Sequence, residues 1–399
     1  MKIAFVGIGQ SYPSHLWMGR MRQMLGEQIV VNIDDMRNTT QGTPMQSDTL
    51  YIPRRQSGFR RVASALRLTS ETKESMRDEW LLKTITQHDA SLAFVHFLDF
   101  AVRFHEVWSR LDIPIVVHCH GYDITWDVRH HTDGTLLHPL NYRDSVRDLP
   151  DNVWFIANST YTQSQLEQLG INPEKIFLKR FGVPVSHRPN AIPADASPRI
   201  LFLGRLVDFK GPLETVQAFS QIAQRHDQAR LDIAGGGDLA SAIQQRIRDL
   251  GTESSIHCHG AVSSDRGQEL RDQSVIFTAH NQTGEMTGQQ EAFGVSLLEA
   301  MGQGIPVVTG RSGGIVDFVH HEENGMLFTP GDIDAHAGML NELLSSPKRR
   351  EELGEAAWHS VRQNYQPHHE QSDLNRIFRQ VSDAGSMPTV QPKTKRHAA

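Results

Sequence analysis

Short apolar runs alternate with stretches of helical periodicity along almost the whole chain. Such alternation predicts βα units, in which successive strands lie parallel in one sheet and helices cover its faces. The pattern restarts near the middle, so the predicted fold class is α/β with two parallel sheets. The expected strands are residues 2–6, 29–33, 91–97, 114–118, 153–157, 199–203, 230–234, 255–259, 275–279, 305–309 and 325–328, and the helices of the first half are 16–25, 70–86, 100–111 and 162–169.

A segment without periodicity separates the two halves. Its sequence, VPVSHRPNAIPADASP, is rich in Pro, Ala and Ser, which is typical of a linker. A last helical stretch follows the break at Tyr365-Gln366-Pro367, and the polar, basic tail after it is expected to be disordered. The expected divisions are an N-terminal domain (1–182), a linker (183–198), a C-terminal domain (199–365), a final helix (366–384) and a tail (385–399).

Composition narrows the class of protein. A chain of 399 residues suits two domains, and no apolar run approaches the ~18 residues of a membrane span. The start MKIAFVGIG lacks the core of a signal peptide, and the two cysteines exclude a disulfide framework, so a cytoplasmic location is expected. The net charge of −6 argues against nucleic-acid binding. Although the chain has 21 histidines, none has the spacing of a short metal motif, so no metal site is expected.

The stretch EAFGVSLLEAMGQGIPVVTG (291–310) carries two carboxylates, Glu291 and Glu299. Its pattern predicts a loop, a helix beginning near Phe293-Gly294, a glycine stop and a strand. Backbone N–H groups at such a helix start attract phosphate, and the two acids can accept from hydroxyls on either side of it. A nucleotide sugar, with its ribose, diphosphate and hexose, has this layout.

A second loop, GRLVDFKGPLETVQAF (204–219), offers positive charge. Arg205 and Lys210 follow a strand and a glycine turn and precede a helix that begins near Pro212. An Arg fork and a Lys point charge can together neutralise a leaving diphosphate. Two further glycine clusters, Gly235–Gly237 and Gly313-Gly314, suit either phosphate binding or close backbone packing.

Both loops resemble the signatures of the retaining family-4 glycosyltransferases of the GT-B class, which have two Rossmann-like domains facing across a cleft and a C-terminal helix that crosses back. The resemblance implies that Glu291 contacts the donor sugar and Glu299 the ribose. It also implies donor contacts by Ala292, Phe293 and Gly294. It further implies catalysis with retention of anomeric configuration. No D-x-D motif is expected to anchor the donor through a metal, so no cofactor or metal is expected beyond the nucleotide sugar itself.

The acceptor side is expected near residues 114–123, PIVVHCHGYD, a strand that runs into a glycine turn. His118 and His120 share one face, and His120 lies at the carboxyl end, where open α/β sheets bind ligands. The H-G-x-D ending resembles that of exopolysaccharide glycosyltransferases of the colanic acid and amylovoran type. That resemblance implies a catalytic role for His120, with Asp123 orienting it or binding acceptor.

The first loop, beginning Gly7-Ile8-Gly9, leaves an alternative open. It suggests dinucleotide binding, but Tyr12 replaces the third glycine of G-x-G-x-x-G and Pro13 disturbs the expected helix start. Resemblance to GT-B enzymes instead implies that Gly9 faces the donor phosphates.

Residues 51–68, YIPRRQSGFRRVASALRL, combine five arginines with an apolar stripe. This composition suits either an anionic membrane surface or a solvated loop. In the first case the protein would lie at the inner face of the membrane.

The sequence therefore favours a glycosyltransferase acting on a glycan, lipid-linked or small-molecule acceptor. The alternatives are a GT-B epimerase or phosphorylase, a non-catalytic sugar-nucleotide-binding protein and, third, an NAD-dependent dehydrogenase.

Overall fold

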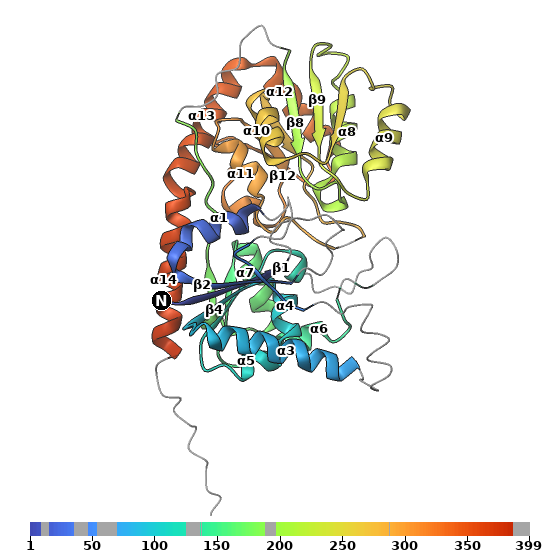
Figure 1. The fold of residues 1–399 in the computed structure, drawn as a ribbon. Helices are drawn as coiled ribbons and strands as arrows, with labels where there is room; N and C mark the ends of the chain where they lie inside the picture. The colour runs from blue at the N-terminus through green and yellow to red at the C-terminus, as the bar shows by residue number, and fades with distance from the viewer. Residues whose placement is uncertain are drawn as a thin grey trace, which may run out of the picture.

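Two parallel β-sheets, each flanked by helices, form the framework of the computed structural model (Figure 1). The structure describes residues 1–8, 16–35, 47–53, 70–124, 136, 138–187, 197–286 and 288–385. Within these residues no helix is long and apolar enough to cross a membrane. The α/β class predicted from the alternating pattern is confirmed, because every strand pair inside both sheets is parallel.

The N-terminal sheet has seven strands within the described residues, in the order β3-β2-β1-β4-β5-β6-β7. The strands of its centre are almost wholly buried, since helices cover both faces. Its strands are β1 (Ile3–Ile8), β2 (Ile29–Asp35), β3 (Leu50–Tyr51), β4 (Leu92–His96), β5 (Ile115–His118), β6 (Val153–Ala157) and β7 (Ile176–Leu178), and its helices are α1 (Leu16–Leu25), α3 (Ser70–Gln87), α4 (Leu98–Arg103), α5 (His105–Ser109), α6 (Tyr142–Arg147) and α7 (Thr160–Leu169).

The C-terminal sheet has six strands within the described residues, in the order β10-β9-β8-β11-β12-β13. Its strands are β8 (Arg199–Leu203), β9 (Arg230–Ala234), β10 (Ile256–Gly260), β11 (Ile276–Ala279), β12 (Val307–Gly310) and β13 (Met326–Phe328), and its helices are α8 (Pro212–Ser220), α9 (Ala240–Asp249), α10 (Ser264–Asp272), α11 (Val295–Met301), α12 (Ile333–Ser345) and α13 (Pro347–Asn364). The last described helix, α14 (Pro367–Gly385), follows α13.

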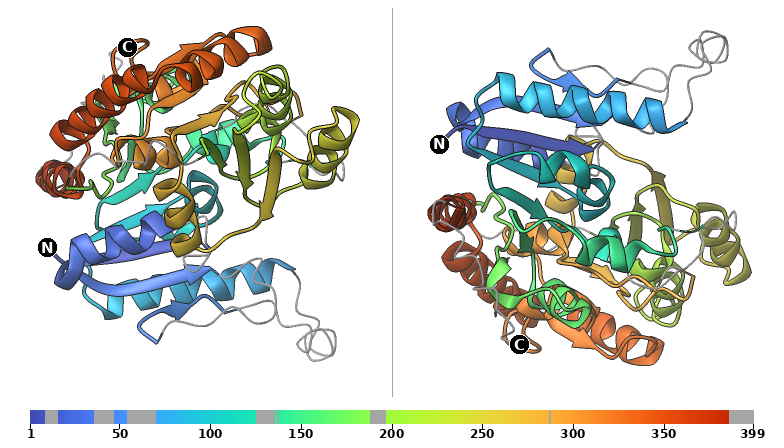
Figure 2. Two further views of the ribbon diagram at one scale, coloured as in Figure 1. Left: turned by 90° about the horizontal axis from the view of Figure 1, so that it is seen from above. Right: turned by 90° about the horizontal axis from the view of Figure 1, so that it is seen from below.

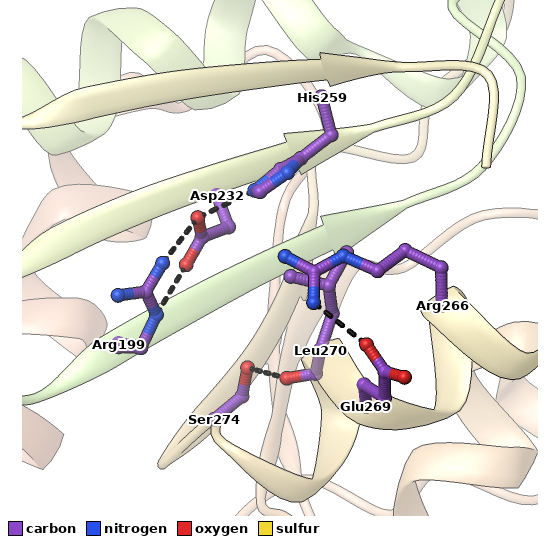
Figure 3. Close-up of polar contacts among 7 residues, drawn as sticks. All are labelled: Arg199, Asp232, His259, Arg266, Glu269, Leu270 and Ser274. Atoms are coloured by element: carbon purple, nitrogen blue, oxygen red, sulfur yellow. Dashed lines mark hydrogen bonds and ion pairs between the residues drawn. The ribbon is translucent and has the colours of Figure 1, made fainter.

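A buried aspartate ties three neighbouring strands of this sheet together (Figure 3). Asp232 on β9 accepts two hydrogen bonds from Arg199 on β8, at 2.7 and 2.8 Å, and lies 2.7 Å from His259 Nε2 on β10. Because Asp232 is only 1% exposed, its charge requires these partners. His259, one of the histidines in the run 257–259, thus has a structural partner.

The strands predicted from the apolar runs are present within about two residues of their expected ends. Two short edge strands, β3 and β7, were not expected, because two or three residues give no readable periodicity. The helix expected over 100–111 is instead two helices, α4 and α5, which meet at Phe104. Phe104 and Trp108 are both buried there, with ring centroids 6.5 Å apart. Tertiary packing of this kind is invisible to local patterns.

Helix α14 returns from the C-terminal half to the N-terminal sheet, as predicted. Figures 1 and 2 show the last two helices, in red, along one side of the molecule beside both halves. Glu370 of α14 forms a buried ion pair with Lys179, which follows β7, and accepts a hydrogen bond of 2.9 Å from Gly182 N. Farther along α14, the ring of Phe378 packs against that of Phe94 at 5.0 Å.

The Lys179–Glu370 pair generates a stability prediction. Glu370→Leu leaves a buried ammonium without a partner and should lower the free energy of unfolding by about 3–5 kcal/mol. The double variant Lys179→Met/Glu370→Leu removes both charges and should recover most of that loss. Urea midpoints of the wild type and the two variants measure the effect. A single variant as stable as the wild type, or a double variant no better than the single, would contradict the assignment.

Candidate functional site

A cavity of about 680 Å³ opens between the two sheets. Residues that follow the carboxyl ends of β5, β8, β9 and β10 line it, together with residues of α1, α10 and α11. This edge is where open parallel sheets bind ligands. The lining includes Trp17, Arg20, His120, Gly121, Tyr122, Gly204, Arg205, Lys210, Gly235, Arg271, Glu291, Ala292, Val295, Ser296 and Glu299.

Lys210 and Glu291, 81 residues apart in the sequence, form an ion pair at the cavity wall. Lys210 ends a 3-10 turn (η5, Asp208–Lys210), and the next residue, Gly211, has φ +59. A Cβ at Gly211 would lie 2.1 Å from His280 O, so the close approach of these two loops requires glycine. The turn therefore fixes the position from which Lys210 reaches Glu291.

The loop 281–290, described except for residue 287, holds this turn in place. Gln282 N donates to Phe209 O at 2.9 Å, and Met286 N donates to Asp208 Oδ2 at 2.9 Å. On the far side, Gly314 N donates to Glu291 O at 2.7 Å. The backbone around both charged residues is thus positioned before any ligand contacts them.

Glu299 lies one turn into α11 and joins the two halves of the molecule. It accepts a hydrogen bond of 2.9 Å from Arg20 Nη1 on α1, and its other oxygen lies 3.3 Å from Arg271 Nη1 on α10. The sequence predicted Glu299 but not the two arginines. Neither arginine belongs to a recognisable motif, and their approach depends on how the two sheets face each other.

Arg205 follows β8 and is exposed at the cavity, with its Cζ 5.6 Å from the centre of the Phe209 ring. The structure therefore brings Arg205, Lys210, Glu291 and Glu299 to one cavity. The lysine and the two glutamates already have partners of opposite charge, which compensates their partial burial.

The residues after Glu291 divide between cavity and core. Ala292 lines the cavity, whereas the Phe293 side chain is 2% exposed and packs against the rings of Phe181 and Phe318 at 5.4 and 5.2 Å. Gly294 precedes α11 with φ +100 and is not among the cavity-lining residues. The side chain of Phe293 thus anchors the loop that carries Glu291 to the hydrophobic core.

The two glycine clusters serve close backbone packing. A Cβ at Gly235 would lie 1.8 Å from Gly204 O, and one at Gly313 would lie 2.0 Å from Glu291 O. Gly235 also lines the cavity, so the same glycine allows close backbone packing and is accessible to a ligand. Gly313 is not among the cavity-lining residues, which favours the packing interpretation for that cluster.

His120 lies on the N-terminal side of the cavity, where its ring packs against that of Trp17 in a tilted arrangement with centroids 4.1 Å apart. Asp123 is fully buried and does not line the cavity. Its carboxylate accepts backbone hydrogen bonds from Leu98 N at 2.9 Å, His120 N at 2.9 Å and Gly121 N at 2.7 Å. Asp123 thus positions the loop that carries His120 rather than the imidazole itself.

Two predicted regions cannot be placed. Gly9, expected to face the donor phosphates, lies outside the described residues, as do residues 54–68 of the arginine-rich segment. Trp17, Arg20 and Arg271 are the main cavity residues that the sequence did not indicate.

Comparisons with known proteins show that this chain is similar to glycosyltransferases in sequence and in fold. Residues 186–359 match the family model described as glycosyl transferases group 1. The matched region carries Arg205, Lys210, Glu291 and Glu299, whereas His120 lies outside it.

Sequence similarity to curated relatives covers a longer stretch of the chain than residues 186–359. The chain is 28% identical over 243 residues to an uncharacterized glycosyltransferase of Methanocaldococcus jannaschii, covering 58% of this chain and 60% of that protein. It is 29% identical over 203 residues to an amylovoran biosynthesis glycosyltransferase of Erwinia amylovora, covering 50% of each. The chain thus matches about half the length of these relatives.

Likeness in fold covers nearly the whole chain. The crystal structure of Anabaena HepE in complex with UDP matches with a TM-score of 0.73 at 18% identity, covering 95% of this chain and 100% of that one. The predicted GT-B architecture, two Rossmann-like domains with parallel sheets facing across a cleft, is confirmed as a fold.

Burial of Asp123 generates a pH prediction. Desolvation raises the pKa of its carboxyl from 3.8 to about 6, although the backbone hydrogen bonds oppose the shift. Between these values the folded protein keeps a proton that the unfolded chain has lost, so the stability contributed by Asp123 falls as pH rises from about 4 to 6. The loss over this window is about 3 kcal/mol.

Urea unfolding of the wild type and of Asp123→Asn between about pH 4 and 7 tests this sign. The stability of the wild type relative to the variant should fall with rising pH and level off above the folded pKa. Asp151→Asn, at an exposed aspartate, is the matched control and should show no such trend. A constant difference between wild type and Asp123→Asn across the range would refute the raised pKa.

Proposed function

We propose that this protein is a retaining glycosyltransferase that moves a sugar from a nucleotide diphosphate sugar to a hydroxyl acceptor. The observation that carries the proposal is the convergence of Arg205, Lys210, Glu291 and Glu299 on one interdomain cavity. The group 1 match and the UDP bound in the structure of Anabaena HepE support it. The amylovoran relative favours an acceptor in polysaccharide or glycoconjugate biosynthesis.

The charges of the cavity suit the polarity of such a donor. Arg205 and Lys210 bind the diphosphate, which gains negative charge as the bond to the sugar breaks. Glu291 accepts from sugar hydroxyls, and Glu299 accepts from the ribose. The ion pair with Glu291 keeps the Lys210 ammonium at the place where the phosphate charge develops.

The anomeric configuration of the sugar is retained because the acceptor approaches the same face of the sugar from which the leaving group departs. The bond between the anomeric carbon and the phosphate oxygen breaks while the acceptor oxygen bonds to the same face, and the acceptor proton passes to the departing phosphate. Glu291 supports the developing positive charge of the sugar and forms no covalent bond to it. His120, on the opposite wall, contacts the sugar beside the reacting carbon.

The proposal also covers the cofactor requirement, the class of acceptor and the location of the protein in the cell. The two cations, rather than a metal ion, compensate the donor diphosphate, so no cofactor is needed for donor binding. Acceptors of the glycan, lipid-linked and small-molecule classes all fit a hydroxyl nucleophile. A cytoplasmic location, with contact of residues 51–68 to an anionic membrane surface, completes the proposal.

Thermal-shift measurements against a panel of sugar nucleotides identify the donor, and proton NMR of the product then reports its anomeric configuration. A product of inverted configuration would disprove retention. Release of an altered sugar would indicate an epimerase, tight donor binding without turnover would indicate a binding protein, and stabilisation by a nicotinamide dinucleotide alone would indicate a dehydrogenase.

Lys210→Ala tests the phosphate assignment. Loss of one preorganised charge at the leaving group should raise the activation free energy by about 2–4 kcal/mol, which lowers kcat/KM by roughly 30- to 10³-fold. Lys348→Ala is the matched control, since Lys348 is exposed on α13 and should leave turnover unchanged. Steady-state kinetics with the identified donor give the comparison. Unchanged turnover in Lys210→Ala would rule out this role for the lysine.

A further inference from the structure

Three histidines from two neighbouring strands converge beside the cavity. His96 ends β4 and His118 ends β5, and these residues lie directly opposite each other in the parallel register. His120 lies two positions further along the chain and so shares the face of His118. One ring nitrogen from each histidine lies within 4.8 Å of the others, and His96 Nδ1 is 3.3 Å from His120 Nε2.

His118 supplies an independent observation. Its side chain is 0% exposed, and neither ring nitrogen has a hydrogen-bond partner among the described residues. A buried imidazole without a partner costs about 1–3 kcal/mol in lost hydration, so such a group in a folded protein calls for an explanation, of which a bound ion is one.

Aromatic rings surround the three histidines. The rings of Trp17 and Phe97 pack on His120, with centroids 4.1 and 4.6 Å away, and the ring of Phe181 packs on His118 at 5.5 Å. Lys179, whose ammonium lies over the Phe181 ring, is paired with Glu370, so its charge is compensated.

We propose that His96, His118 and His120 bind one divalent transition-metal ion of the zinc class at the floor of the cavity. Neutral imidazole is a preferred ligand of Zn²⁺, and metal–nitrogen bonds of about 2.0–2.1 Å would draw the three ring nitrogens closer together than the 4.8 Å within which they now lie. His120 alone of the three lines the cavity, so the fourth coordination position faces the cavity. Three protein ligands with one open position is the pattern of reactive rather than structural zinc sites.

This site adjoins the proposed donor site and shares His120 with it, but it is separate from the diphosphate position, where cations and not a metal compensate the charge. It also explains why the sequence indicated no metal motif. His96 lies 22 residues before His118, and only the pairing of β4 with β5 brings them together. Metal binding is measured without donor or acceptor, so its outcome does not depend on the proposed glycosyl transfer.

The test uses the full chain without a polyhistidine tag. Equilibrium dialysis against Zn²⁺ with elemental analysis should give one tight equivalent, and Co²⁺ should give the intense visible absorption of a tetrahedral site. Zn²⁺ should also raise the melting temperature. In His118→Phe and His96→Phe the tight equivalent should weaken by more than the 10–100-fold typical of loss of a supporting residue outside the ligand set.

His257→Gln is the matched control, because His257 and His259 form a histidine pair elsewhere, with ring centroids 4.5 Å apart. This variant should bind Zn²⁺ as the wild type does. Circular dichroism confirms that each variant is folded, and phenylalanine suits a site already lined by aromatic rings. Absence of a tight equivalent in the wild type, or equal binding by wild type, His118→Phe and His96→Phe, overturns the proposal.

Discussion

The return of helix α14 to the N-terminal sheet is the constraint on which the cavity depends. Its anchor is an ion pair in an apolar interior, between Lys179 and Glu370, reinforced by the hydrogen bond from Gly182 N. Charges buried in this way are stable only while both partners are present. The ion pair therefore fixes the position of α14 against the N-terminal domain. That position in turn keeps the carboxyl ends of the strands in the two sheets opposite each other. Without that alignment, His120 and Glu291 would belong to separate surfaces.

Within the cavity, the electrostatic arrangement is one of paired charges rather than of isolated ones. Glu291 has Lys210, and Glu299 has both Arg20 and Arg271. Pairing permits these groups to be partly buried, which a lone carboxylate would resist. It also keeps them in fixed directions, so that under the proposed transfer these groups would reorganise little as charge develops on the donor phosphate.

Much of this could be predicted from the sequence, because the signals were local. The apolar runs gave the strands, and the glycine turns around Arg205 and Glu291 gave the loops that reach the cavity. The failures have a common physical origin in tertiary contacts. Nothing near Arg20 in the sequence indicates that it meets Glu299, 279 residues away. Phe293 lies in a motif expected to bind donor, yet its side chain fills the core beneath. Asp123 was expected near the acceptor, but it holds backbone amides instead.

The contact between Arg20 and Glu299 has a thermodynamic consequence. It is an ion pair between the two domains, and the carboxylate that forms it is also the group that we propose accepts from the donor ribose. Occupancy of the ribose position and separation of the two domains are then linked equilibria: whatever changes one must change the other by the same free energy. Ionic strength acts on the bridge through screening. A change in salt concentration should consequently alter the affinity for nucleotide and the separation of the two domains together, because both depend on the same ion pair.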